Sequence, residues 1–194
     1  MSFETDKKNA LDKIVLYDKS KKGSVDKEIS NLVREINRKR DYYTTSSCAG
    51  RILLIKHAKS CRKDEAEWLL ASHSEVSFPA LKKALEKAAL FDDETWFKQE
   101  PLILHVACRD YDSAERLIHI VRSKCGLRRA GVMSLKRNII EIIGSDMMYT
   151  IVAKDRKVLV DDSYFKRLLE KANEKVDKNK KRIEKLYSEI KKLK

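Results

Sequence analysis

Glycine is scarce in this chain. Only five of the 194 residues are glycine, at positions 23, 50, 126, 131 and 144. No two of them lie close enough to form the Gly-x-Gly turn that opens a dinucleotide-binding site, and the same spacing excludes a P-loop. Any nucleotide cofactor must therefore be held by an architecture other than a glycine-rich turn after a buried strand.

Long apolar runs are also absent. No hydrophobic stretch approaches the roughly 20 residues that a membrane-spanning helix needs. Residues 1–13 carry acidic side chains early and contain no apolar signal core. We therefore expect a cytoplasmic protein that has no membrane partner.

The cysteines lack the spacing of a metal site. The four cysteines stand at positions 48, 61, 108 and 125, and none of them forms a Cys-x-x-Cys pair. Their separations match no common zinc template. In a reducing compartment we expect four thiols and no metal.

Charge, by contrast, is abundant and mostly of one sign. The chain has 43 lysines and arginines against 30 acidic residues, which gives a net charge of +13 and a pI near 9.5. Such a surface attracts a polyanion by releasing counterions, so it indicates a nucleic-acid partner, with an anionic membrane surface as the competitor. The length favours one compact domain, residues 1–194.

Hydrophobic periodicity predicts helices at both ends of the chain and an α/β core between them. The expected helices cover 4–19, 24–40, 78–90, 113–124 and 163–194, and the expected strands cover 51–55, 68–73, 102–107, 131–135, 139–143, 148–153 and 157–160. Strand–loop–helix order occurs twice, which suggests a pseudo-repeat within residues 41–160. We predict an α+β fold with a mixed or antiparallel sheet built from two similar strand–strand–helix–strand halves. N-terminal helices (1–40) and a long C-terminal helix (161–194) flank it.

The expected C-terminal helix is basic and carries a heptad seam. Apolar side chains and one asparagine alternate in steps of three and four, at 165, 168, 172, 176, 179, 183, 186, 190 and 193. Residues 163–194 also hold 12 lysines and arginines against five acidic residues. The seam can pack on the N-terminal helices. The basic faces fit either a solubilising role or contact with RNA.

The segment Thr45–Arg51 is the best local candidate for a binding site. Ser46, Ser47 and Cys48 offer hydroxyl and thiol groups, and Gly50 lets a ligand approach the backbone closely. Arg51 can hold a carboxylate or a phosphate with its guanidinium fork. The alternative is a tight entry into a strand, with Arg51 in an internal salt bridge.

Glu100 and His105 form a second candidate. Glu100 is held extended by Pro101, and His105 follows on a buried strand. A carboxylate and an imidazole near one edge of a sheet can do acid–base work. The alternative is a surface acid and a hydrogen-bonded core histidine.

A third candidate is the glycine-flanked stretch 126–134. Arg128 and Arg129 suit a phosphate or a stacked base, and Arg137 extends the basic patch beyond Ser134. Basic loops are common in a protein of this charge, so a plain surface loop is the alternative.

Four blocks of sequence together resemble a known family. They are the run Tyr42-Tyr43-Thr44-Thr45-Ser46-Ser47-Cys48-Ala49-Gly50-Arg51-Ile52, the run from Phe97 to Arg109 with Glu100-Pro101 and Leu104-His105-Val106, the stretch Gly126–Ser134, and the helix Asp162–Ser188. The chain resembles the tRNA wybutosine-synthesizing protein 3 family over essentially its whole length. It departs at Arg129-Ala130, where relatives often have Asn-Ser.

This resemblance implies an archaeal-type, S-adenosylmethionine-dependent tRNA methyltransferase that does not have the Rossmann-type fold. The methyl group would go to N4 of the tricyclic wyosine-type base at position 37, in the anticodon loop of phenylalanine tRNA. Ser46, Ser47, Cys48, Gly50 and Arg51 would bind the cofactor, with Arg51 on the methionine carboxylate or on a phosphate. Glu100 or His105 would accept or orient the proton lost from N4.

The same resemblance implies a set of RNA contacts. Tyr42, Tyr43 or Trp96 would stack on the modified base, and cationic or hydroxyl side chains would contact the RNA: Arg128, Arg129, Ser134, Arg137, Lys180, Lys181 and Arg182. Two other classes of protein compete with this interpretation. One is a tRNA-binding module without catalysis, and the other is a structural protein that dimerises through the C-terminal seam.

Overall fold

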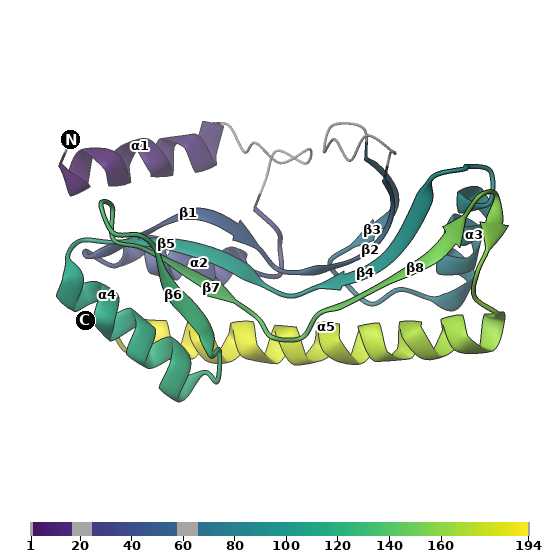
Figure 1. The fold of residues 1–194 in the computed structure, drawn as a ribbon. Coiled ribbons are helices and arrows are strands. Elements are labelled where there is room, and N and C mark those ends of the chain that lie inside the picture. Colours follow the sequence, from purple (N-terminus) through teal and green to yellow (C-terminus); the bar gives the residue numbers. More distant parts are fainter. Residues whose placement is uncertain (1, 17–24, 58–65, 194) are drawn as a thin grey trace. The chain divides into compact units, whose positions relative to one another are not determined.

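The computed structural model describes residues 2–16, 25–57 and 66–193 (Figure 1). The chain forms two compact units. Unit 1 consists of Met1–Ala49, Leu102–Ser145 and Asn179–Lys194, and unit 2 consists of Gly50–Pro101 and Asp146–Lys178. The chain therefore passes from one unit to the other four times. None of the described helices is long and apolar enough to cross a membrane.

Unit 1 is built on a four-stranded antiparallel sheet in the order β1-β5-β7-β6. Its strands are β1 (Tyr42–Cys48), β5 (Ile103–Cys108), β6 (Arg129–Ser134) and β7 (Ile139–Ile143), and its helices are α1 (Phe3–Leu16), α2 (Ser30–Arg38), α4 (Tyr111–His119) and the π-helical turn η2 (Ile120–Lys124). One sheet face forms the main core with α2 and α4. On the other face Tyr43 packs against Phe3 of α1, with ring centroids 5.2 Å apart.

Unit 2 is built on a five-stranded antiparallel sheet in the order β3-β2-β4-β8-β9. Its strands are β2 (Arg51–His57), β3 (Glu67–Ser72), β4 (Glu94–Glu100), β8 (Met148–Lys154) and β9 (Lys157–Val158), and its helix is α3 (Phe78–Ala88). Ser77 caps α3 by accepting a hydrogen bond from the backbone N–H of Ala80. The core lies between α3 and one face of the sheet, where Phe97 is completely buried.

The predicted α+β class and its antiparallel pairing are confirmed, and the single predicted sheet is in fact two sheets. The two strand–helix repeats fall in different units, since β3–α3 lies in unit 2 and β5–α4 in unit 1. Two strands were not predicted: β1 and β4. Both are rich in hydroxyl or charged residues. In β4 buried and accessible positions alternate. The sequence does not reveal this alternation, because the buried positions include the polar side chains of Thr95 and Gln99.

The starts of two predicted helices differ from the structure. The second helix was expected from Ser24, which lies outside the described residues, but α2 begins at Ser30 after a turn over 27–29. The helix expected from Ser113 begins at Tyr111, because Asp110 caps it by accepting from the Ser113 N–H at 2.8 Å. Ser113 is therefore the third residue of a capping box, not the helix start.

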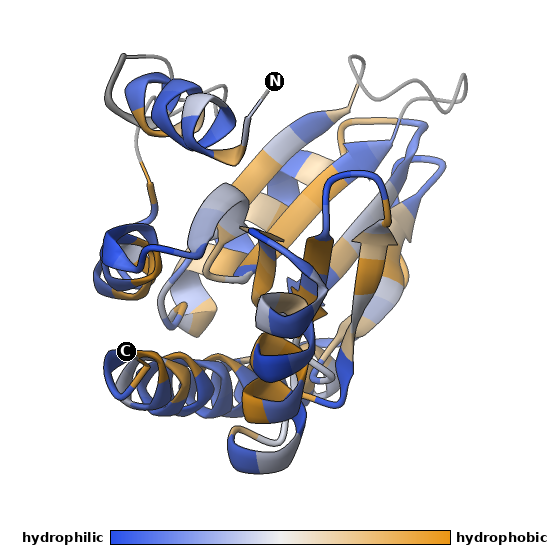
Figure 2. Cartoon of the chain, turned by 90° about the vertical axis from the view of Figure 1, so that its left-hand side faces the viewer, coloured by the Kyte–Doolittle hydropathy of each residue, from blue (hydrophilic) through white to orange (hydrophobic). Residues whose placement is uncertain are grey.

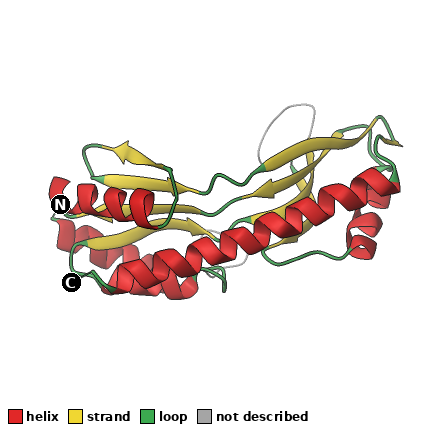
Figure 3. Cartoon of the chain, turned by 90° about the horizontal axis from the view of Figure 1, so that it is seen from below, coloured by secondary structure: helices red, strands yellow, loops and turns green. Residues whose placement is uncertain are grey.

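The C-terminal helix α5 (Asp162–Lys191) has 30 residues, as the seam predicted (Figure 3). Its first half buries four side chains in the core of unit 2: Phe165, Leu169, Ala172 and Val176. Its second half buries Ile183, Leu186 and Ile190 in the core of unit 1. Along its length α5 carries both hydrophobic and hydrophilic residues (Figure 2).

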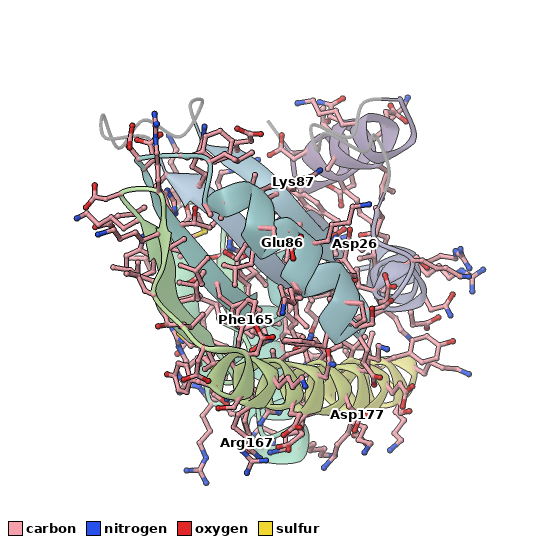
Figure 4. All side chains as sticks on the ribbon, turned by 90° about the vertical axis from the view of Figure 1, so that its right-hand side faces the viewer. Asp26, Glu86, Lys87, Phe165, Arg167 and Asp177 are labelled. Atoms are coloured by element: carbon pink, nitrogen blue, oxygen red, sulfur yellow. The ribbon has the colours of Figure 1, made fainter. Side chains whose placement is uncertain are left out.

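In the first half of α5, apolar and charged side chains lie on opposite sides of the helix, as two residues show. Phe165 lies on the side of the helix that meets the strands of unit 2, and Arg167 points away from them (Figure 4). The apolar seam is thus covered by the chain's own cores. A protein that dimerises through this seam, the second alternative drawn from the sequence, would have to expose it, so that alternative loses its interface.

Candidate functional site

The segment Thr45–Arg51 contains the end of β1 and the point at which the chain passes from unit 1 to unit 2. Ser46, Ser47 and Cys48 belong to β1 of unit 1, where Ser46 is exposed and the other two are half-buried. Gly50 and Arg51 belong to unit 2. Gly50 has a φ of +83°, in the left-handed region that glycine adopts at no steric cost. The backbone conformation therefore favours glycine at this position, and the close approach of a ligand expected from the sequence stays a prediction.

Arg51 forms an ion pair with Glu100. The two residues are register partners on β2 and β4, and the Nε–H of Arg51 donates to Oε2 of Glu100 at 2.8 Å. The guanidinium carbon lies 4.5 Å from the ring centroid of Trp68 on β3. The internal salt bridge weighed as an alternative is therefore present. It uses one of the five N–H donors of the guanidinium group, so the fork can still hold a second anion.

The backbone at Gly50 is also held from β3's side of the sheet. Nδ1 of His73 lies 2.7 Å from the carbonyl oxygen of Gly50. Because a carbonyl can only accept, Nδ1 of this imidazole carries the proton. His73 had no evident partner in the sequence, and only the turn after β3 brings it to the site.

Two buried side-chain oxygens of unit 2, on Thr95 and Gln99, lack a hydrogen-bond partner among the described residues. Oε1 of Gln99 is fully buried and has no hydrogen-bond partner among the described residues, while its Nε2 donates to the carbonyl of Glu100 at 2.9 Å. An unsatisfied buried acceptor is costly, about 1–3 kcal/mol, and such groups in folded proteins usually have an unseen water or ligand as partner. Gln99 adjoins Glu100 in sequence, but its side chain lies on the buried face of β4 with Phe97, opposite to the face of the Arg51–Glu100 pair.

His105 pairs with Glu141 and not with Glu100. It lies on β5 of unit 1, and its Nε2 is 3.1 Å from Oε1 of Glu141 on β7. The pairing register sets Ser46 of β1 opposite His105 on the other side, and Gly131 of β6 opposite Glu141. Cross-strand neighbours share a face. The structure thus replaces the expected Glu100–His105 pair by two pairs, Arg51–Glu100 in unit 2 and His105–Glu141 in unit 1.

The tyrosines expected to stack on a base are buried. Tyr43 is 2% exposed beneath α1, and Tyr42 is 3% exposed, with its hydroxyl donating to the carbonyl of Ser113 at 3.0 Å. Burial raises the pKa of Tyr42 to about 12. Neither ring offers a face to a ligand, so the assignment of Tyr43 to base stacking is corrected to a packing role.

The basic residues named from the sequence lie on accessible positions. Arg128, Arg129 and Arg137 are exposed near β6, where Ser134 is half-buried. On α5, Lys181 is exposed, and Lys180 and Arg182 are half-buried beside the inward-facing Asn179.

The buried cysteines are not nucleophiles. Burial raises the pKa of Cys108 to about 12 and also raises the pKa of Cys125. A thiol reacts as its thiolate, so these two side chains are packing residues. Cys48 is half-buried, and Cys61 lies outside the described residues.

The chain is similar to known proteins over nearly its full length. A family model described as methyltransferase TYW3 matches residues 5–192. A tRNA wybutosine-synthesizing protein 3 homolog of Danio rerio is 36% identical over 188 residues, which cover 94% of this chain and 72% of the relative. The tRNA(Phe) 7-((3-amino-3-carboxypropyl)-4-demethylwyosine(37)-N(4))-methyltransferase 1 of Pyrococcus furiosus is 34% identical over 191 residues, covering 97% and 95% of the two chains. The solved structure of the PH1069 protein from Pyrococcus horikoshii has a TM-score of 0.89 at 30% identity, covering 99% of this chain and 97% of that one.

Proposed function

This chain belongs to the TYW3 methyltransferase family, and we propose that it methylates N4 of a demethylwyosine-type base at position 37 of tRNA(Phe) with S-adenosylmethionine as the methyl donor. The observation that carries the proposal is the family match over residues 5–192. A relative that is named for this reaction is matched over 95% of its own length. We place the reaction in the cytoplasm and the contact with tRNA in its anticodon loop.

The side chains of unit 2 fit such a methyl donor. Arg51 retains N–H donors that can hold the carboxylate of the donor's methionine part. S-adenosylmethionine supplies a methyl group on a positively charged sulfur, which departs as a neutral thioether. The assignments of Ser46, Ser47 and Cys48 to cofactor binding stay predictions.

His105 is the proton acceptor that we propose. As the N–C bond forms and the C–S bond breaks, the proton on the ring nitrogen must leave. A carboxylate oxygen of Glu141 faces Nε2 of His105 at 3.1 Å, so Nε2 donates to it and Nδ1 presents a lone pair. Glu100 is less suited, because its carboxylate is already engaged by Arg51. Glu141 is therefore a positioning residue for His105.

Methylation of defined RNA tests this function. Phenylalanine tRNA with an unmethylated tricyclic base should gain one methyl group, detected by mass spectrometry of the isolated nucleoside, when protein and S-adenosylmethionine are both present. Calorimetric titration with S-adenosylmethionine should give a saturable signal. Binding of the tRNA without either result would favour the alternative, a tRNA-binding module without catalysis.

The basic residues in the second half of α5 predict a salt dependence of tRNA binding. If α5 contacts RNA phosphates, replacing Lys180, Lys181 and Arg182 together by alanine should flatten the slope of log affinity against log salt by about one unit for each lost contact. Filter binding of tRNA over a salt series measures the slope. The matched control removes three cations from the first half of α5: Lys166, Arg167 and Lys171. An unchanged slope in the first variant would leave this part of α5 as a structural helix.

The thiol of Cys48 is not needed for the proposed reaction. Direct transfer of a methyl group to nitrogen needs no covalent intermediate on the enzyme. We therefore expect Cys48→Ser to retain measurable methylation in a single-turnover assay, with any loss coming from packing of this half-buried residue. Complete inactivity of a folded variant that still binds S-adenosylmethionine would require a thiol mechanism instead.

A further inference from the structure

The face of the unit 2 sheet that lies opposite the core carries both cationic and aromatic side chains. Residues 51, 53 and 55 of β2 share one face with their register partners 100, 98 and 96 of β4, and Lys98 in turn pairs with Tyr149 of β8. The opposite face bears Phe97 and the core beneath α3. This face therefore carries Arg51, Trp96, Lys98 and Tyr149 around the buried side chains of Leu53 and Ile55, with Trp68 of the adjoining β3 beside Arg51.

Cations and aromatic rings alternate across this face. The Nζ atom of Lys98 lies 5.5 Å from the ring centroid of Trp96, 5.8 Å from that of Tyr149 and 2.8 Å from Nε2 of His57. The guanidinium carbon of Arg51 lies 4.5 Å from the ring centroid of Trp68. Two of these rings are strongly exposed, Trp68 at 42% and Tyr149 at 48%. A single exposed ring is common on a folded surface, but several rings grouped with cations on one face form a patch of the kind that marks a binding surface.

The electrostatics of the same face favour an anion. Burial lowers the pKa of Lys98, with Glu100 acting in the opposite direction. Burial and the charge of Lys98 lower the pKa of His57. Nζ of Lys98 donates to Nε2 of the His57 imidazole at 2.8 Å, and an incoming phosphate would stabilise the charge of this half-buried lysine.

We propose that this face of β3, β2, β4 and β8 binds unpaired nucleotides of an RNA, with bases stacked on Trp68 and Tyr149 and a backbone phosphate beside Lys98. Aromatic platforms interleaved with cations are how proteins hold single-stranded nucleic acid. Trp68 and Tyr149 stand on strands three spacings apart, roughly 14 Å, so the two rings serve different bases. The inference rests on the proposed function, in which the substrate loop supplies the unpaired bases.

Both tryptophans of the protein lie on this face, so intrinsic tryptophan fluorescence reports on it alone. A short oligouridine should quench the fluorescence of the full-length protein in a saturable way. An RNA duplex with the same number of phosphates should quench less, because its bases are already stacked on one another. Equal quenching by the two would show attraction by charge only and would overturn the proposal.

A matched pair of tyrosine variants locates the binding. Tyr149→Ala should weaken binding of oligouridine by roughly 5- to 150-fold, the range for one lost base–aromatic contact. Tyr164 of α5 is 49% exposed, almost as much as Tyr149, and Tyr164→Ala should leave the affinity unchanged. Equal affinities of the two variants, with both proteins folded by circular dichroism, would overturn the assignment.

A matched pair of lysine variants tests the phosphate contact. Lys98→Gln should lower the salt slope by about one unit. Lys166→Gln, which also removes a lysine lying over an aromatic ring, should not. Methylation assays on the same proteins keep the two proposals apart. Active enzyme with no quenching by oligouridine contradicts only the stacking face, whereas quenching without methyl transfer contradicts only the proposed function.

Discussion

Replacing His105 by glutamine should lower the single-turnover rate of methyl transfer by roughly 10²-fold or more, the lower range for a lost general base. Affinities for S-adenosylmethionine and tRNA should stay close to those of the unchanged protein. The reason is geometric. His105 lies on a central strand of the sheet in unit 1, with Nε2 held by Glu141 at 3.1 Å, and glutamine keeps a hydrogen bond to Glu141 but has no site that accepts a proton. Rapid-quench kinetics with labelled methyl donor measure the rate.

Two further variants decide between His105 and the other candidate base. Glu141→Gln should lower the rate less than His105→Gln, because it removes only the group that orients the imidazole. Glu100→Gln should act mainly on binding, since its carboxylate holds Arg51 at 2.8 Å. A hundredfold slower Glu100→Gln variant beside a His105→Gln variant with the normal rate would reverse the assignment and make Glu100 the proton acceptor.

The main outlines of the fold could be predicted because they depend on local patterns. The shortage of glycine excluded a Rossmann-type turn, and the steps of three and four along residues 163–194 predicted the 30-residue helix α5. The strand β1 was missed because its Thr-Thr-Ser-Ser run carries no apolar alternation. It is a strand because β5 pairs with it from Tyr42 to Cys48 and because Tyr42 reaches the core. Tertiary pairing overrides propensity at such positions.

The site residues were found one by one, but their partners were not. Arg51 and Glu100 are 49 positions apart, and His105 and Glu141 are 36 apart, so each pair is created by strand register, which a single sequence does not reveal. The blocks that resemble the family contain Arg51, Glu100 and His105. Nothing local pointed to Glu141. The exposed aromatic rings of Trp68 and Tyr149 were likewise invisible, because their face depends on the pairing of β2, β3, β4 and β8.

Asn179 lies in the heptad seam of α5, which the sequence predicted, but its hydrogen-bond partners could not be predicted. Its place in the heptad seam was expected, but a polar residue there carried no stated role. In the structure Asn179 is 4% exposed, its Oδ1 accepts from the backbone N–H of Leu102 at 3.0 Å, and its Nδ2 donates to the carbonyl of Ala49. Ala49 and Leu102 are the unit 1 residues at two chain crossings, next in sequence to Gly50-Arg51 and to Glu100-Pro101. One amide thus anchors both segments from which the Arg51–Glu100 pair extends.

Replacing Asn179 by leucine should therefore destabilise the protein more than any surface change. The substitution leaves two buried backbone groups without partners, each costing about 1–3 kcal/mol, so the expected loss is roughly 2–6 kcal/mol in the free energy of unfolding. Urea unfolding followed by circular dichroism measures it. Asn173 is the matched control, because it also lies on α5 and bonds both the N–H and the C=O of Val76 at 3.0 Å, but it is only half-buried. Water can replace its amide, so Asn173→Leu should cost less.

Amide hydrogen exchange assigns each loss to its hydrogen bond. Asn179→Leu should accelerate exchange at Leu102 and leave Val76 protected, whereas Asn173→Leu should do the reverse, because each amide N–H has one of these side chains as its acceptor. If Leu102 keeps its protection in Asn179→Leu, the side chain does not hold the crossing and the role given to it is wrong. If protection is lost and the affinity for S-adenosylmethionine falls with it, α5 positions the Arg51 segment through the side chain of Asn179, a role that neither the charge nor the hydrophobic packing of this helix would provide.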